Sequence, residues 1–268
     1  MSSPMPVTQD QPASAKAEQL TTTYQLGTLQ REFDVRLTKM TLFGGIVSLI
    51  VGGALGFFAY QMLTSPRNIN DINNAPILII PGIIFLLVAL YCFFYPIIYS
   101  SWHIYIYSEG FAYTRINKVT AFRWDQIESM LQAVTRQYMN GIYVGTNHKY
   151  TISGLDGKKI VLNDIISNVG TAGEIIADMV TRVKLPQAIE SFQAGNTLNF
   201  GKLSISSQGI SNGKETIAWE QVKGINVNAG IVTVKKDNQW LSWSSVRVAQ
   251  IPNFFVFLAL VKAIQSQA

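Results

Sequence analysis

The sequence contains few of the residues from which catalytic and metal sites are built. Its 268 residues include one cysteine, Cys92, and two histidines, His103 and His148. One cysteine cannot form a disulfide within the chain, and neither histidine has a Cys pair or acidic cluster around it at the spacing of metal ligands. Nucleotide-binding glycine loops and the Gly-x-Ser-x-Gly turn of hydrolases are also missing. These absences predict a protein that is not an enzyme and holds no metal or cofactor.

Charged residues are scarce as well. They make up 14% of the chain, against 48% hydrophobic residues, which is an apolar balance for a soluble protein. The formal net charge is +5, and because the charges of residues 1–100 cancel, the surplus is spread over residues 101–268. Nucleic-acid binding needs a denser basic face, so we expect no nucleic-acid partner.

Two long runs without a charged residue account for the apolar excess. They cover residues 40–63 and 75–99. Each exceeds the length of about 20 residues that a helix needs to cross a bilayer. A cleaved signal peptide would begin closer to the N-terminus and be shorter, and a buried core helix rarely stays free of charge for so long. The sequence therefore predicts a transmembrane hairpin with a loop at residues 64–74.

The flanking charges predict the orientation of this hairpin. The loop has one basic residue, Arg67. The basic residues that flank the hairpin are Arg31, Arg36 and Lys39 before it and Arg115 and Lys118 after it. The positive-inside rule then places both termini in the cytoplasm of a two-span cell-membrane protein. Neither span contains Asp, Glu, Lys, Arg or His, which favours an anchor over a transporter or channel.

Small residues in the first run suggest how the hairpin packs. Gly44, Ser48, Gly52 and Gly56 recur every four residues and predict a seam on which another helix can approach closely. Gly82 and Ala89 offer a matching seam in the second run. The partner is either the second helix of the hairpin or another copy of the chain in a homodimer. We favour the second helix, because the short loop keeps it close.

The region before the hairpin, residues 1–39, is interpreted as a cytoplasmic tail. Up to about residue 23 it is rich in Ser, Thr, Gln and Pro without an aromatic residue, which predicts disorder. From Tyr24 to Lys39 apolar residues return at helical spacing. We expect that segment to extend the first span or to lie on the membrane surface.

After the hairpin the chain repeats itself. SEGFAYTRINKVTAFRWDQI, residues 108–127, is echoed by SQGISNGKETIAWEQV, residues 207–222. Further short β-rich runs follow each copy, and each series closes with a helix, expected at residues 171–183, ended by Pro186, and at residues 251–265. ISNV and IPNF mark the same helix entry in the two copies. The sequence thus predicts two similar domains, residues 101–185 and 186–268, each with six or seven strands and one C-terminal helix.

Several of these motifs carry a family resemblance: EGF and FRWDQI, LDGKKI, LPQAIESFQAG, FGKLSISSQGI, AWEQV and IPN. With them the chain resembles uncharacterised bacterial membrane proteins in which a two-helix hairpin precedes tandem pleckstrin-homology-like domains. The resemblance implies a membrane-anchored α+β fold with two split β-barrels, each capped by a C-terminal α-helix. It implies no catalytic activity.

The repeated residues are expected to serve the fold. Gly110 and Gly209 predict tight turns with positive φ, and Trp124 and Trp219 predict aromatic residues at the core or its rim. We interpret SEG and SQG as the loops between the first two strands of each domain. In lipid-binding members of the pleckstrin-homology fold that loop is long and basic, so the lipid site is expected to be missing twice.

Two functions remain open. The first is a cytoplasm-facing, non-enzymatic interaction or scaffold module whose partners are the lipid bilayer and another protein. The alternative is a peripheral sensor that binds anionic lipid or a small ligand. The candidate contacts for anionic lipid are Arg115, Lys118, Lys158 and Lys159.

Overall fold

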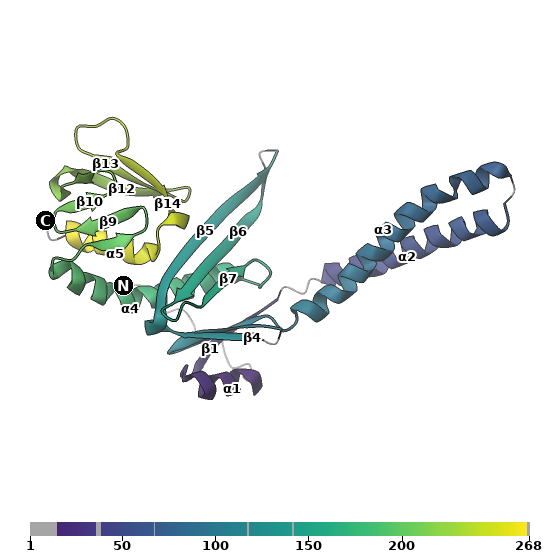
Figure 1. The fold of residues 1–268 in the computed structure, drawn as a ribbon, viewed down its shortest axis with the longest axis horizontal. Coiled ribbons are helices and arrows are strands. Elements are labelled where there is room, and N and C mark those ends of the chain that lie inside the picture. The colour runs from purple at the N-terminus through teal and green to yellow at the C-terminus, as the bar shows by residue number, and fades with distance from the viewer. Residues whose placement is uncertain (1–14, 36–38, 67, 117, 141, 267–268) are drawn as a thin grey trace. The chain divides into compact units, whose positions relative to one another are not determined.

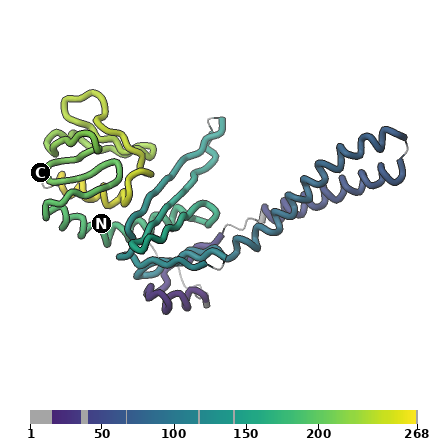
Figure 2. The backbone as a smooth tube through the Cα atoms, in the orientation of Figure 1, coloured from purple at the N-terminus to yellow at the C-terminus, as the bar shows by residue number. Residues whose placement is uncertain are grey.

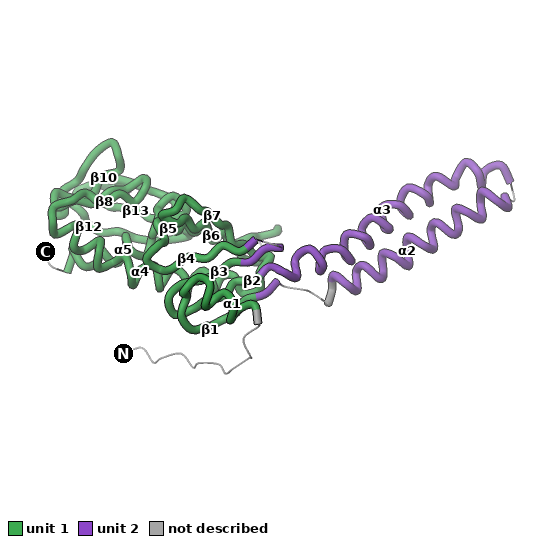
Figure 3. The backbone as a smooth tube through the Cα atoms, turned by 60° about the horizontal axis from the view of Figure 1, so that its bottom comes forward, with its two compact units in different colours: residues 1–33, 103–113, 119–268 green, residues 34–102, 114–118 purple. Residues whose placement is uncertain are grey.

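The computed structural model describes residues 15–35, 39–66, 68–116, 118–140 and 142–266. The chain separates into two compact units, which Figure 3 colours differently. Unit 1 groups residues 1–33, 103–113 and 119–268, and unit 2 groups residues 34–102 and 114–118. Most strands belong to unit 1, and the two long apolar helices belong to unit 2.

The long helices of unit 2 are α2 (Lys39–Thr64) and α3 (Ile69–Tyr99), which form a hairpin (Figure 1). Both are long and apolar enough to cross a membrane, as the sequence predicts. The expected loop at residues 64–74 is wrong, because α3 begins at Ile69. Asn68 caps this helix, and its side-chain oxygen accepts hydrogen bonds from the N–H groups of Asn70 and Asp71. With 31 residues at about 1.5 Å each, α3 is longer than the hydrocarbon core of a bilayer, which is about 30 Å thick. Its first turns are polar and precede the apolar stretch.

The first sheet of the folded region begins before the hairpin. Its strand order is β1-β2-β3-β4. The N–H of Ser108 donates to the carbonyl of Thr28 over 2.9 Å, and His103 Nδ1 lies 3.2 Å from Glu32 Oε1, so β1 and β2 run antiparallel side by side. The strands are β1 (Leu29–Asp34), β2 (His103–Tyr107), β3 (Gly110–Arg115) and β4 (Lys118–Arg123). The hairpin is therefore inserted between two neighbouring strands, and the expectation that residues 24–39 extend the first span or lie on the membrane surface is wrong for β1.

Helix α1 (Ala15–Tyr24) packs on this sheet. Its Ala17 and Leu20 are buried in one cluster with Tyr105 and Tyr107, and the Tyr107 hydroxyl donates to the carbonyl of Ala17 over 2.9 Å. Burial raises the pKa of Tyr107 to about 12. The expected disorder up to about residue 23 is thus wrong from residue 15 onward, and the rest of the expected tail, residues 1–14, lies outside the described residues.

A three-stranded sheet and a long helix complete the first copy of the repeat. The sheet has the order β5-β6-β7 and follows the short 3₁₀ helix η1 (Trp124–Gln126). Its strands are β5 (Ile127–Met139), β6 (Ile142–Gly154) and β7 (Lys159–Asn163), and the helix is α4 (Val169–Gln193). The expected domain boundary at residues 185 and 186 falls inside α4, and Pro186 lies within the helix instead of ending it.

The second copy repeats this order without an insertion. A sheet of order β11-β10-β9-β8 is followed by one of order β12-β13-β14 and by α5 (Figure 1). The core combines both sheets, α5 and the C-terminal part of α4, from which Ala188 is buried and Phe192 packs alongside. The elements are β8 (Leu198–Phe200), β9 (Leu203–Ser206), β10 (Gly209–Ser211), β11 (Thr216–Ile217), η2 (Trp219–Gln221), β12 (Val222–Asn228), β13 (Ile231–Lys236), β14 (Ser244–Arg247), η3 (Val248–Gln250) and α5 (Phe254–Gln265).

The two copies agree in hydrogen bonds as well as in element order. Trp124 Nε1 donates to the carbonyl of Ser108, and Trp219 Nε1 donates to that of Ser206, both over 3.0 Å. Each tryptophan therefore ties a 3₁₀ helix to the end of the second strand of its copy. The ladders β5–β6 and β12–β13 also share a register shift at the same place, after Ile127 and Val222.

The repeated glycines serve close approach. A Cβ at Gly110 would collide with the carbonyl of Phe122, and one at Gly209 with the carbonyl of Ile217. Only Gly209 has a positive φ, of 148°, so the expectation of a positive φ is wrong for Gly110. SEG joins β2 to β3 and SQG joins β9 to β10. These turns connect the second and third strands of the two sheets, which corrects their interpretation as first loops.

Candidate functional site

The seam of the membrane-length hairpin contains only part of the predicted stripe. Ser48 and Gly52 are buried against α3. A Cβ at Gly52 would lie 3.0 Å from Leu86 and 3.1 Å from the carbonyl oxygen of Gly82. The backbones therefore approach closely where these two glycines face each other. Gly82 and Ala89, the residues expected on the second helix, are both buried.

Gly44 lies outside this contact, and Gly56 contributes only its backbone, whose nitrogen would lie 3.6 Å from a Cβ at Gly82. A Cβ at either position would meet no atom within 4 Å. An α-helix has 3.6 residues per turn, so each step of four residues turns about 40° beyond a full circle and a strict four-residue stripe leaves the contact. The buried positions of α2 also include Gly45 and Ala59; with Ser48 and Gly52 they follow one another in steps of three, four and seven residues, as the helical period requires.

Aromatic residues gather at the C-terminal end of α3. The rings of Tyr95 and Tyr99 lie 4.5 Å apart between their centroids, and those of Tyr99 and Trp102 lie 4.7 Å apart. The guanidinium of Arg115 sits over the Trp102 ring at 4.3 Å. Tyrosine and tryptophan rings next to a cation are typical of the interface between hydrocarbon and water. Arg115, a predicted lipid contact, is thus part of this aromatic cluster.

The four candidate lipid contacts fall into two pairs in different compact units. Arg115 and the exposed Lys118 flank the turn between β3 and β4 in unit 2. Lys158 and Lys159 lie at the turn between β6 and β7 in unit 1. Lys158 Nζ lies 2.6 Å from Asp156 Oδ2; this hydrogen bond lowers the pKa of Asp156 and raises that of Lys158. Asp156 offsets the charge of Lys158. Of the two lysines at this turn, Lys159 is therefore the stronger candidate for a lipid contact.

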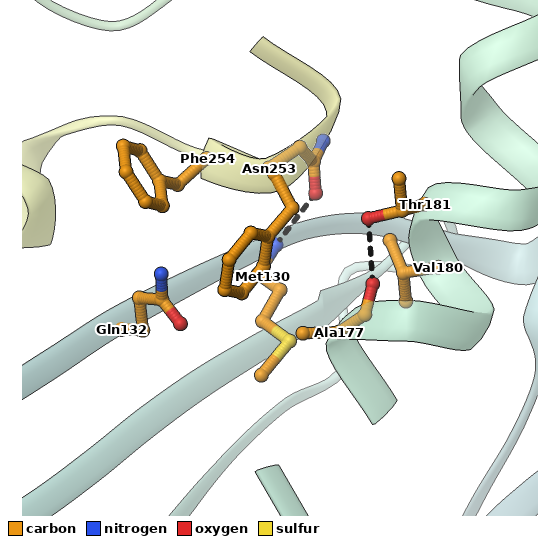
Figure 4. A pocket seen from close by; sticks show the side chains of 8 residues that line it. Met130, Gln132, Ala177, Val180, Thr181, Asn253 and Phe254 are labelled. Carbon is orange, nitrogen blue, oxygen red and sulfur yellow. Dashed lines mark hydrogen bonds between the residues drawn. The ribbon is translucent and has the colours of Figure 1, made fainter. Parts of the chain in front are cut away.

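The two copies are joined through the edge of β5. Asn253, which precedes α5 with a positive φ of 52°, donates its N–H to the carbonyl of Met130 over 2.9 Å and accepts the N–H of Met130 on its Oδ1 over 3.0 Å (Figure 4). Its Nδ2 also donates to the carbonyl of Glu128 over 3.0 Å. The side chain thereby satisfies backbone groups at a sheet edge. Asn168 precedes α4 with the same φ of 52°, but its side chain is exposed.

The pocket at this junction is too small for an organic ligand. It encloses about 10 Å³ between Met130, Val180 and Phe254, which is room for about one water molecule (Figure 4). Nearby, burial lowers the pKa of Lys184, against the opposing effect of the Glu128 charge. Within the described part of the chain, no three His, Cys, Asp or Glu side chains gather in a way that could hold a metal ion.

The family comparison covers the hairpin and both copies. The sequence model of DUF6585, described as a family of unknown function, matches residues 1–268. The chain belongs to this family. No curated protein matches the sequence, and no solved structure matches it. DUF6585 membership thus places hairpin and repeats in one family without assigning them a chemistry.

This DUF6585 chain has one further feature that the sequence reading left unassigned. Strands β5 and β6 have 13 residues each and continue well past β7, which pairs only with residues 149–153 (Figure 2). Large apolar side chains crowd the end of this ribbon and are 53–70% exposed. They are Tyr138, Met139, Ile142, Tyr143 and Val144, and we refer to them as the ribbon tip. An Asn-Gly pair between apolar triplets, QYM-NG-IYV, is a hairpin signal that could have identified the ribbon.

Proposed function

We propose that this protein is a non-enzymatic interaction or scaffold module, anchored in the membrane by α2 and α3, whose two pleckstrin-homology-like domains face the cytoplasm. The observation that carries the proposal is the position of the hairpin between β1 and β2. Four residues connect β1 to α2 and three connect α3 to β2. An extended residue spans at most about 3.6 Å, so both ends of the hairpin are tethered closely to neighbouring strands.

The surface of the hairpin supports an anchor. Its large apolar side chains are exposed, as at Phe43 (68%), Ile50 (65%) and Ile97 (70%). A core helix of a soluble protein would bury such residues, whereas lipid can surround them. Residues 40–63 and 75–99 contain no Asp, Glu, Lys, Arg or His that could serve an ion or proton path.

The domain comparison also supports an anchoring role. Each copy combines a four-stranded sheet, a three-stranded sheet and a C-terminal helix, which is the plan of the pleckstrin-homology fold. In lipid-binding members of that fold, the loop between the first two strands is long and basic. In the first copy the hairpin occupies this connection, and in the second copy only Gly201 and Lys202 do. We infer that a permanent anchor has replaced a reversible lipid contact.

Cysteine labelling in intact cells tests the anchor and its orientation. In a Cys92→Ala background, we expect an impermeant maleimide to label Asn70→Cys from outside. Ser266→Cys should be labelled only after permeabilisation, because the basic residues flank the hairpin on the side of the termini. Labelling of Ser266→Cys in intact cells would overturn the cytoplasmic placement of the domains.

Crosslinking in intact cells tests the interaction role. A partner protein should be captured by the full chain and by a variant with residues 35–102 replaced by Gly-Lys, but not by the hairpin alone. Capture by the hairpin alone would assign the interaction to α2 and α3 and contradict the proposal.

The alternative, a sensor of anionic lipid, rests on the exposed basic residues. It predicts that reversing Arg115, Lys118, Lys158 and Lys159 to Glu abolishes binding of the hairpin-free variant to anionic vesicles. The scaffold proposal predicts that reversal changes this binding by less than twofold, because Arg115 and Lys158 already have partners within the chain. Vesicle flotation with and without anionic lipid measures the difference.

A further inference from the structure

The ribbon tip is an extension that only the first copy has. The equivalent strands of the second copy, β12 and β13, share the register shift near their start but have 7 and 6 residues, against 13 each in β5 and β6. The extra length places its largest exposed apolar side chains at its very end. Exposed apolar residues that cluster in this way mark a contact surface.

The apolar side chains lie on both faces of the ribbon. Tyr138 pairs with Tyr143, with ring centroids 5.9 Å apart, and the next pair is Met139 with Ile142. Successive residues of a strand point to opposite faces, so the tyrosine pair occupies one face and the Met–Ile pair the other. A protein that docks on one face would leave the other in water. A lipid layer surrounds both faces at once.

The charges around the tip fit a negatively charged surface. From residue 129 to residue 155 the sequence contains no Asp or Glu. It contains Arg136 and Lys149, both exposed, and His148, which is held by Asp164 at 2.8 Å. Basic residues close to a bilayer are attracted to anionic lipid headgroups, and the missing carboxylates remove the opposing repulsion.

We propose that the ribbon tip inserts into the interfacial layer of a bilayer that contains anionic lipid. The depth of insertion follows from the backbone. The outer edges of a two-stranded ribbon carry N–H and C=O groups that cannot enter the hydrocarbon centre without partners. Tyr138 lies two residues before Asn140 at the turn, which corresponds to about 7 Å along the strand. This matches the depth of about 5–10 Å at which amphipathic elements bury apolar side chains, with tyrosine rings at headgroup level.

The inference rests on the proposed membrane anchor, which holds the chain at a bilayer and raises the effective concentration of the tip there. The experiment therefore uses the full chain in lipid nanodiscs containing phosphatidylserine, in a Cys92→Ala background. An environment-sensitive fluorophore is placed at Met139→Cys, at Leu155→Cys or at Ile84→Cys. Met139 and Leu155 have matched exposures of 66% and 68%, and Ile84 lies in α3.

Lipids with a spin label at carbon 5 of the acyl chain should quench the probe at Met139→Cys at least twofold more strongly than the probe at Leu155→Cys. Equal quenching at these two positions overturns the tip inference. The probe at Ile84→Cys should be quenched by lipids labelled at carbon 12. Absence of quenching at Ile84→Cys would instead contradict the membrane anchor. The experiment therefore distinguishes failure of the tip inference from failure of the anchor.

A second variant pair tests the apolar contact itself. With the probe at Val144→Cys, the double change Met139→Glu and Ile142→Glu should reduce quenching at least threefold. The control changes Val227→Glu and Ile231→Glu, on the shorter ribbon of the second copy, should leave it unchanged. If the probe is shielded from water but not quenched by lipid, and the shielding rises with protein concentration, the tip contacts a second copy of the chain and the bilayer proposal is wrong.

Discussion

The two copies share one order of strands and helix, but the large side chain in the core comes from the helix in one copy and from a strand in the other. In the second copy, the helix supplies the bulk through Phe257, and the strand position equivalent to Tyr150 of the first copy is Val232; both are fully buried. In the first copy, the strand supplies Tyr150, whose ring lies against Gly173 of α4, and the residue equivalent to Phe257 is Ala172. A large side chain on the strand and a small one on the helix, or the reverse, fill the same core volume. The packing density and the arrangement of strands and helix are thereby preserved.

The copies differ most in the connection between their first two strands. The first copy accommodates residues 35–102 there, because β1 and β2 are neighbours and a hairpin returns to its starting point. In the second copy, Gly201 and Lys202 close the same gap. Insertion at a tight turn leaves the strand pairing intact, which explains how one copy of the repeat can carry two helices of membrane-spanning length.

The largest effect is expected from removing β1 and α1. Replacing residues 35–102 by Gly-Lys, the second copy's own connection, should give a soluble chain with cooperative unfolding. A fragment of residues 103–268 should be aggregated or far less stable, because it loses the buried side chains of Leu20, Leu26 and Phe33, each worth about 1.5–3 kcal/mol. Circular dichroism melts and gel filtration compare the two. Equal stability would mean that the first sheet does not need the residues before the hairpin.

Strand β1 is the element that the sequence analysis did not predict. Leu29 and Phe33 fit a helix and a strand equally well, and the partner strand β2 lies beyond the hairpin, so local periodicity could not decide. A signal was present in the helix ends. YQLG at residues 24–27 and FQAG at residues 192–195 are similar in sequence and lie at the ends of α1 and α4, and both of their glycines have a positive φ, of 79° at Gly27 and 83° at Gly195. The repeat therefore begins upstream of the hairpin.

The elements that were predicted have local causes. Residues 40–63 and 75–99 are apolar throughout, and the repeated strands are short β-rich runs with turn residues between them, so pattern alone identified them. The seam on α2 was half right because Ser48 and Gly52 satisfy both a four-residue spacing and the true helical period. The exposed ribbon tip was not predicted, because its exposure depends on where β7 ends, and no local sequence pattern determines that.

The second largest effect should come from the core of the second copy. Phe257→Ala removes a fully buried ring whose centroid lies 5.4 Å from that of Phe200, and should cost about 3–5 kcal/mol of unfolding free energy. Phe255→Ala, two residues earlier and 42% exposed, should cost less than about 1 kcal/mol. Urea titration of the hairpin-free chain measures both. Similar losses would show that α5 does not close the second core through Phe257.

The corresponding test in the first copy adds volume. Gly173→Ala would place a methyl group against the Tyr150 ring and should cost about 1–3 kcal/mol through overpacking. Combining it with Tyr150→Val, the residue at the equivalent strand position of the second copy, should remove the clash. The double variant should therefore be more stable than the sum of the single changes predicts. Strict additivity in a double-mutant cycle would contradict the volume exchange.

A smaller effect is expected in the hairpin. Gly52→Leu should weaken the contact of α2 with α3, since even a Cβ there lies within 3.1 Å of the Gly82 carbonyl oxygen. Gly53→Leu is the matched control, because a Cβ at Gly53 meets nothing within 4 Å. We expect the melting temperature of the full chain in detergent to fall for Gly52→Leu alone. Equal melting of the two variants would remove Gly52 from the seam.

The smallest expected effect belongs to a carboxylate in the second copy. Trp243 Nε1 donates to Glu215 Oε2 over 3.0 Å and Lys236 Nζ donates to Oε1 over 3.3 Å; these bonds lower the pKa of Glu215. Because the folded pKa lies below the unfolded value, the stabilisation is present above the usual glutamate pKa of about 4.3 and is lost as the pH falls through the folded pKa. Glu215→Gln keeps an acceptor but loses the charge. The native chain should therefore melt slightly above the variant at pH 6, and the gap should close by pH 3. A gap that stays constant over this range would show that the Trp243–Glu215–Lys236 contacts stabilise the second copy without the carboxylate charge.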